Sequence, residues 1–206
     1  MVASFARRLE QIQQRKRSNL ALWIGPRLLQ MPLPMQKYDD PYLPFGKAII
    51  DATQPVVCAY VFDLASYLAL GAAGAIALER TIGYARANGD TLIVLHGPFA
   101  TPDYVEAAGA GGFHVDAVTL VDEQHLEAYG QVPGLGMFVV REGENPVIIP
   151  LPGAAGAFWP RAELLTLLTE DGRRLELRLA GPRVLYAGRG DDFAQRVRDA
   201  LEALRA

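Results

Sequence analysis

Lysine is scarce in this chain and is confined to its N-terminal part. It occurs at only three positions, Lys16, Lys37 and Lys47, and none follows Lys47. Any chemistry that needs a lysine ammonium group from the rest of the chain is therefore excluded.

Cysteine, basic charge and long apolar runs are also scarce. Cys58 is the only cysteine, so no internal disulfide can form, and its apolar surroundings indicate a small core residue. The net charge of −3 provides no basic surface for nucleic acid. No run of about 18 apolar residues predicts a membrane span. We therefore expect a cytoplasmic protein that binds neither nucleic acid nor membrane, with residues 1–206 forming a single domain.

Clustered metal ligands are absent as well. The three histidines, His96, His114 and His125, follow no metal-ligand spacing. No hydrolase, kinase or dinucleotide-binding motif is present. The sequence therefore predicts no metal site and no cofactor.

The first segment of the chain predicts a basic amphipathic helix. Phe5, Leu9 and Ile12 share one helical face, while arginines and a lysine occupy the remainder. Such a helix can bind a membrane or a partner. We expect it to be docked on the protein surface by its apolar face.

Short apolar runs of strand length recur along the first two-thirds of the chain, and helical patterns separate several of them. The clearest helical pattern covers residues 71–89, where Gly89 can end the helix. Alternation of strand and helix favours parallel pairing, because parallel neighbours need a crossover connection. The expected strands lie at residues 20–24, 55–62, 91–96, 115–121 and 136–140.

The last third of the chain has a different pattern. Two apolar runs flank the turn-forming residues 142–145 and leave no room for a crossover helix, so we expect a β-hairpin near residues 136–150. Charged and apolar residues alternate through residues 174–180, as in a strand with one wet face. The expected elements of this region are a short helix at 162–168, strands at 174–180 and 183–187, and a final helix at 192–204.

Two segments resemble a known family. The stretch DDPYLPFGKAIIDATQPVVCAYVFDLASYLALGAAGAIALERTIGYARANG, followed by GFHVDAVTL, resembles the longer subgroup of bacterial orotidine 5′-phosphate decarboxylases. The resemblance implies a TIM (β/α)8-type barrel, usually dimeric, with the active site at the C-terminal ends of the strands. Because this chain is short and its second half predicts a hairpin, we expect an α/β barrel that is shortened and either incomplete or partly rebuilt with antiparallel strands.

The resemblance also implies a reaction. The family removes carbon dioxide from orotidine monophosphate without a metal or organic cofactor, using lysines and aspartates at the strand ends. Here the position of the lysine on the second strand is Val61. The charged positions of the third-strand motif correspond to Leu95, Gly97 and Ala100, and an aspartate after the first strand corresponds to Gly25. We therefore assign no catalytic residue.

Three residues remain as candidate ligand contacts. Asn145 matches part of a segment that touches the pyrimidine in the family, but is equally a turn residue. Arg183 lies near the place of the family's phosphate-binding arginine, although a solvated strand-end arginine fits as well. His96 ends an apolar strand, where catalytic side chains are often placed.

Two hypotheses follow. The first is a member of the family that has lost decarboxylase activity, a pseudoenzyme that keeps the fold for dimerisation, for binding a partner such as an intact decarboxylase, or for binding a nucleotide or phosphate. The second is an enzyme of altered chemistry on a phosphorylated ligand, using His96 with Asp103 or Arg183. An active orotidine 5′-phosphate decarboxylase is the least favoured reading.

Overall fold

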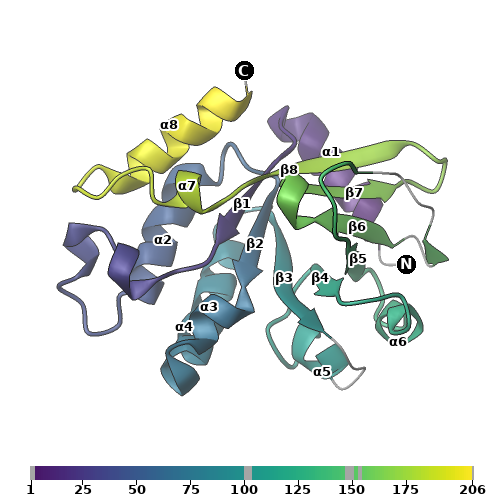
Figure 1. Cartoon of the computed structure of the whole chain (residues 1–206), viewed down its shortest axis with the longest axis horizontal. Helices are drawn as coiled ribbons and strands as arrows, with labels where there is room; N and C mark the ends of the chain where they lie inside the picture. Colours follow the sequence, from purple (N-terminus) through teal and green to yellow (C-terminus); the bar gives the residue numbers. More distant parts are fainter. Residues whose placement is uncertain (1–2, 100–103, 147–150, 153–154, 206) are drawn as a thin grey trace.

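Eight strands close into a barrel in the computed structural model, which describes residues 3–99, 104–146, 151–152 and 155–205 (Figure 1). The strands follow one another around the barrel in chain order, and β8 pairs with β1 to close it. The fold is therefore the expected α/β barrel, and it is closed. The strands are β1 (Leu20–Ile24), β2 (Ala59–Asp63), β3 (Leu92–Phe99), β4 (Ala117–Leu120), β5 (Gly136–Val140), β6 (Gly156–Trp159), β7 (Leu164–Leu168) and β8 (Arg174–Ala180).

Parallel pairing runs from β1 to β6, and β7 is antiparallel to both of its neighbours. The prediction of a β-hairpin near residues 136–150 is wrong. Residues 147–150 lie outside the described part, and β5 already has β4 on one edge and β6 on the other, both parallel. The antiparallel hairpin lies further along the chain, where residues 169–173 connect β7 to β8.

Two other expected elements are wrong. The segment expected as a helix at 162–168 contains strand β7, in which Leu165 and Leu167 both point into the barrel. Pairing on both edges of this strand overrides the local helical pattern. The segment expected as a strand at 183–187 contains helix α7 (Pro182–Leu185), where Pro182 occupies the first turn, a position that proline favours.

The long helices cover the outside of the first three strands (Figure 1). Helix α2 packs against both α4 and α8, and α3 packs against α4. An apolar layer fills the space between these helices and the outward faces of the strands, with Leu22, Phe45 and Phe62 fully buried. The helices are α1 (Phe5–Lys16), α2 (Tyr42–Thr53), α3 (Leu64–Leu68), α4 (Gly71–Ala87), α5 (Val105–Ala108), α6 (Leu126–Gly130), α7 and α8 (Phe193–Arg205).

Helix α1 closes the end of the barrel at which the parallel strands begin. Its apolar face joins the side chains of the barrel interior in one cluster, and the Phe5 ring meets the Phe138 ring edge to face at 5.6 Å. Glycine at 136 is required here, because a Cβ atom would lie 2.5 Å from Cγ of Phe5. The expectation that this helix docks on the protein by its apolar face is thus confirmed. The helix packs across the end of the barrel at which the parallel strands begin.

Two expectations from the composition concern Cys58 and membrane-spanning segments. The Cys58 thiol is buried and donates to the carbonyl oxygen of Ser18, and burial raises its pKa to about 11. This agrees with an inert core cysteine. Among the described residues, no helix is long and apolar enough to cross a membrane.

The position of α1 leads to a stability prediction. Leu9 lies on the inner face of α1 and is fully buried, so Leu9→Ala leaves a cavity at the closed end of the barrel. We expect this change to lower the free energy of unfolding by about 2–5 kcal/mol in urea titrations. Gln14→Ala, at an exposed position of the same helix, is the control and should change it by less than about 0.5 kcal/mol. Equal effects of the two changes would contradict the packing described for α1.

Candidate functional site

His96 lies at the mouth of the barrel, at the end where the parallel strands finish. Its ring is 4.9 Å from the Trp23 ring and 5.3 Å from the Phe158 ring, measured between centroids. Its Nδ1 atom lies 3.0 Å from Oγ1 of Thr119, which is fully buried on β4. Aromatic contacts on two sides and one hydrogen bond therefore fix the imidazole in place.

The surroundings of His96 favour its neutral form. Burial lowers the pKa of the imidazole below its ordinary value, because a charged ring is poorly solvated among aromatic side chains. The Asp63 carboxylate has the opposite and smaller effect. Asp63 and His96 are register partners across the β2–β3 pair, so a carboxylate and a neutral imidazole end adjacent strands.

A hollow of about 590 Å³ opens beside Asp63 at the ends of β1 and β2. The Ser66 hydroxyl donates to the Asp63 carboxylate, which fixes that acid at the edge of the hollow. Arg27 and Tyr42 add polar groups to a lining that is mostly apolar. The volume fits a small organic ligand, and Arg27 supplies a positive charge beside it.

The positions that the sequence resemblance matched to charged residues of the decarboxylases can be located in the structure. Val61 is fully buried inside the barrel. Leu95 belongs to the outer apolar layer, and a Cβ atom at Gly97 would meet Leu64 of helix α3. Ala100 lies outside the described residues. A Cβ atom at Gly25 would lie 2.6 Å from the indole nitrogen of Trp23, so a larger residue there requires the indole to move.

The inward position of His96 differs from the sequence interpretation. The resemblance placed it at an unspecified position between two charged ones, Leu95 and Gly97 in this chain. In the barrel, however, the inward residues of β3 are Leu92, Val94 and His96. His96 is therefore the residue of this strand that lies at the mouth.

The three lysines make their contacts in three separate parts of the structure. The Lys16 ammonium, at the opposite end of the barrel, donates to the carbonyl oxygens of Gln54 and Val57 and to the hydroxyl of Thr91. Lys37 lies over the ring of Tyr38 and precedes helix α2, and Lys47 lies over the ring of Tyr84 between helices α2 and α4. None of these contacts involves a residue that surrounds His96.

The structure shows no contact between the three residues that were predicted to bind a ligand. Asn145 is exposed in the segment after β5, and Arg183 is exposed on helix α7. No contact links either residue to His96 in the described part of the chain. Asp103, the other suggested partner of His96, lies outside the described residues. The ligand-binding roles of Asn145, Arg183 and His96 therefore stay predictions.

Residues that sequence reasoning did not select complete the site. Trp23, Thr119 and Phe158 surround His96, and Ser66 holds Asp63. The alternating pattern of each strand contains the signal, since Trp23 and Thr119 occupy inward positions of β1 and β4. Which inward residues meet at the mouth depends on the stagger of neighbouring strands, which the sequence does not show.

Within the described residues, no group of three or more histidine, cysteine, aspartate or glutamate side chains is placed to hold a metal ion. The polar side chains around Asp63 and His96 are instead a carboxylate, an imidazole and the hydroxyls of Ser66 and Thr119, with Arg27 and Tyr42 in the adjoining hollow. This set can donate and accept hydrogen bonds and can move a proton.

The chain is similar in sequence to curated proteins that share one name. It is 40% identical to the orotidine 5′-phosphate decarboxylase of Phocaeicola vulgatus over 75 residues, which are 36% of this chain and 28% of that protein. It is 29% identical to the enzyme of the same name from Herpetosiphon aurantiacus over 166 residues, which are 80% of this chain and 58% of that protein. The chain is therefore similar to orotidine 5′-phosphate decarboxylases over part of their length.

Solved structures agree on the fold. The orotidine monophosphate decarboxylase of Leishmania donovani superimposes with a TM-score of 0.68 at 17% identity, covering 98% of this chain and 99% of that one. The Leishmania donovani uridine monophosphate synthase gives 0.69 at 15% identity over 99% of this chain and 57% of that one. No protein-family model matches the chain. In the two curated relatives above, this decarboxylase-like chain spans 28% and 58% of their lengths.

The buried His96 predicts a pH-dependent stability. Its pKa is lower in the folded than in the unfolded chain, so below about pH 6.5 the unfolded chain binds more protons and the free energy of unfolding falls. We expect His96→Gln, which can keep a hydrogen bond to Thr119, to lose less stability than the native protein between pH 7.5 and 5.5. Urea titrations at both pH values measure this.

His125→Gln is the matched control and should keep the native pH dependence. An unchanged dependence in His96→Gln would show that the environment of His96 does not disfavour its charged form.

Proposed function

We propose that this chain does not decarboxylate orotidine monophosphate and instead binds a phosphorylated pyrimidine nucleotide at the mouth of the barrel. The observation that carries the proposal is that, in the described part of the chain, none of the contacts of the three lysines involves His96 or the residues around it. The decarboxylases that the chain resembles need an ammonium group beside the reacting carbon to stabilise and protonate a carbanion. A neutral His96 offers no such positive charge.

The hollow at the mouth supports the binding part of the proposal. Tyr42 adds an aromatic ring to a mostly apolar lining that suits a planar base, and Ser66 and Asp63 supply hydrogen-bonding groups. Arg27 lines the hollow, and Arg183 lies exposed beyond β8, so both are available to an anionic phosphate.

A second candidate function rests on the Asp63–His96 pair. A neutral imidazole next to a carboxylate on adjacent strand ends is suited to act as a general base on a bound ligand. An enzyme of altered chemistry acting on a phosphorylated ligand would use this pair.

The proposal extends to the location, the domain organisation and the partners of the protein. We propose a cytoplasmic protein with a single barrel domain, acting as a homodimer or as a heteromer with an intact decarboxylase. The apolar side chains exposed around the mouth side of the molecule, at Leu28, Leu29 and Leu33, are available for such a contact. Mixing the chain with an intact decarboxylase and testing for co-elution distinguishes the heteromer from the homodimer.

The loss of activity is directly testable. We expect the purified chain to leave the absorbance of orotidine monophosphate unchanged over hours at micromolar protein, because no ammonium group reaches the ligand. A preparation of His96→Ala, purified identically, controls for traces of host decarboxylase. Turnover by the native chain that is absent from His96→Ala would contradict the proposal and favour catalysis at this site.

Nucleotide binding is tested separately. We expect uridine monophosphate to raise the melting temperature, since a ligand at a hundred times its dissociation constant stabilises the folded state by about 2.7 kcal/mol. Arg27→Gln should reduce the shift, and Arg80→Gln, which removes an exposed charge from α4, should leave it unchanged. The absence of a shift with uridine monophosphate at millimolar concentration would rule out the binding role.

A further inference from the structure

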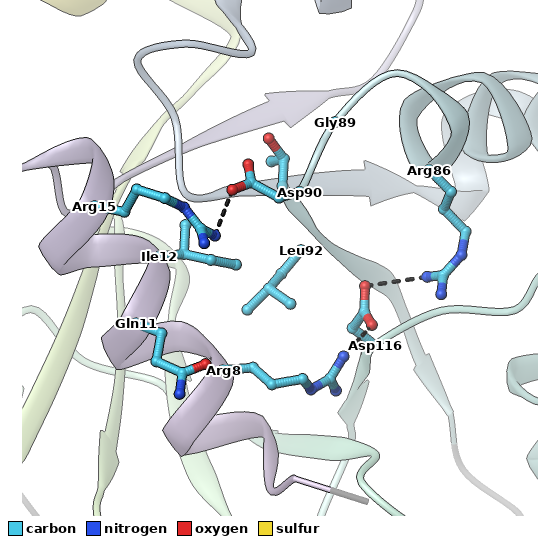
Figure 2. Close-up of a pocket in the computed structure, with 10 residues that line it drawn as sticks. Arg8, Gln11, Ile12, Arg15, Arg86, Gly89, Asp90, Leu92 and Asp116 are labelled. Carbon is cyan, nitrogen blue, oxygen red and sulfur yellow. Dashed lines mark hydrogen bonds and ion pairs between the residues drawn. The ribbon is translucent and has the colours of Figure 1, made fainter.

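A second hollow lies at the opposite end of the barrel, between helix α1 and the first residues of β3 and β4 (Figure 2). Its volume is about 290 Å³. Arg8 and Arg15 extend into it from α1, and Arg86 extends into it from the C-terminal turn of α4. Because α1 closes this end of the barrel, the hollow has no connection with the chemistry proposed for the mouth.

Positive charge exceeds negative charge around this hollow. Three arginines and two aspartates line it, and Lys16 approaches Asp90 to 3.0 Å from behind. The three lining arginines therefore exceed the two lining carboxylates, Asp90 and Asp116, by one charge. In a hollow with partly buried walls, this excess is only weakly screened by solvent.

The two carboxylates already have their hydrogen bonds. Asp116 is nearly buried and accepts from Arg8, from Arg86 at 3.2 Å and from the backbone nitrogen of Ile93 at 2.9 Å. These contacts hold α1 and α4 to the barrel, so they have a structural role. They also fix the directions in which the remaining arginine N–H groups point.

Some of these donors are left over. Nε of Arg8 is buried and has no hydrogen-bond partner among the described residues. Arg15 is mostly exposed and pairs only with Asp90 in the described part of the chain. Figure 2 shows the Arg15 guanidinium beside Asp90 and the Arg8 guanidinium beside Asp116, with Leu92 between them. A buried donor without a partner costs stability unless a ligand or water meets it.

We propose that this hollow binds a phosphate group, either as inorganic phosphate or at the end of a small phosphoester. An anion matches the surplus of positive charge in the lining, and arginine N–H groups recognise phosphate oxygens in a defined geometry. The volume lies at the lower limit of small-molecule sites, so the occupant is little larger than the phosphate itself. This site is separate from the mouth of the barrel and from the function proposed there.

Calorimetric titration of the full chain with inorganic phosphate in a low-salt chloride buffer tests the proposal. We expect saturable binding that weakens about tenfold in Arg86→Gln and about threefold in the more exposed Arg15→Gln. Arg80→Gln on the same helix as Arg86 is the charge-matched control and should bind phosphate as the native chain does.

The location is tested by the arginine side-chain signals in ¹H–¹⁵N spectra. The Nε–H signal of Arg8 should move on addition of phosphate, whereas a purely structural cluster would leave it in place. No saturable binding, or equal weakening in Arg80→Gln, would overturn the proposal. If Arg86→Gln fails to fold, Arg15→Gln and the Arg8 signal still decide the question.

Two further arms separate the sources of the phosphate and the two ends of the barrel. Titration with uridine monophosphate in Arg27→Gln background measures whether a phosphoester occupies this hollow when the mouth is weakened. His96→Gln should leave the affinity for inorganic phosphate unchanged. Loss of phosphate binding in His96→Gln would place the anion at the mouth and overturn the inference, whatever the fate of the proposed function.

Discussion

The pairing of β8 with β1 closes the sheet, and the rest of the structure depends on this closure. Leu20, Ala21 and Leu22 align with residues 178–180 in parallel. The chain reaches this point with β7 running backwards between β6 and β8, so two crossover helices are replaced by short turns. Closure removes the exposed sheet edges and creates an interior that must be filled.

Filling that interior explains where small residues are required. Phe138 and Phe158 occupy the centre with leucines from β7 and β8. A Cβ atom at Gly156 would lie 2.4 Å from the carbonyl oxygen of Thr166 and 2.8 Å from the Phe138 ring. Glycine at this position lets β6 approach β7 while a phenylalanine fills the space. The large Phe138 side chain at the centre of the barrel thus requires a residue without a side chain at position 156.

The sequence predicts the regular part of the fold well and the rebuilt part poorly. The apolar runs at 20–24 and 136–140 coincide with β1 and β5, and the alternating residues 174–180 coincide with β8. These segments succeed because local burial and strand pairing favour the same structure. The prediction fails for residues 164–168 because their strand structure comes from pairing with two neighbouring strands, which leaves no local pattern beyond two inward leucines.

The arrangement of the mouth could not be predicted for a related reason. His96 was selected by its place at a strand end, but its contacts with Trp23, Thr119 and Phe158 come from three other strands.

Charge is distributed unequally between the two ends of the barrel, and this bears on function. At the mouth, His96 is held neutral among aromatic rings, and Asp63 is the acid beside it. At the opposite end, Lys16 and three arginines gather around Asp90 and Asp116. A reaction that builds negative charge on a carbon atom needs a cation within a few ångströms, since the interaction falls with distance and is screened by solvent. The cations gathered at the opposite end therefore stabilise the packing of α1 or an anion beside it. At the mouth, Arg27 lines the hollow, and His96 is surrounded by aromatic rings and a hydroxyl group.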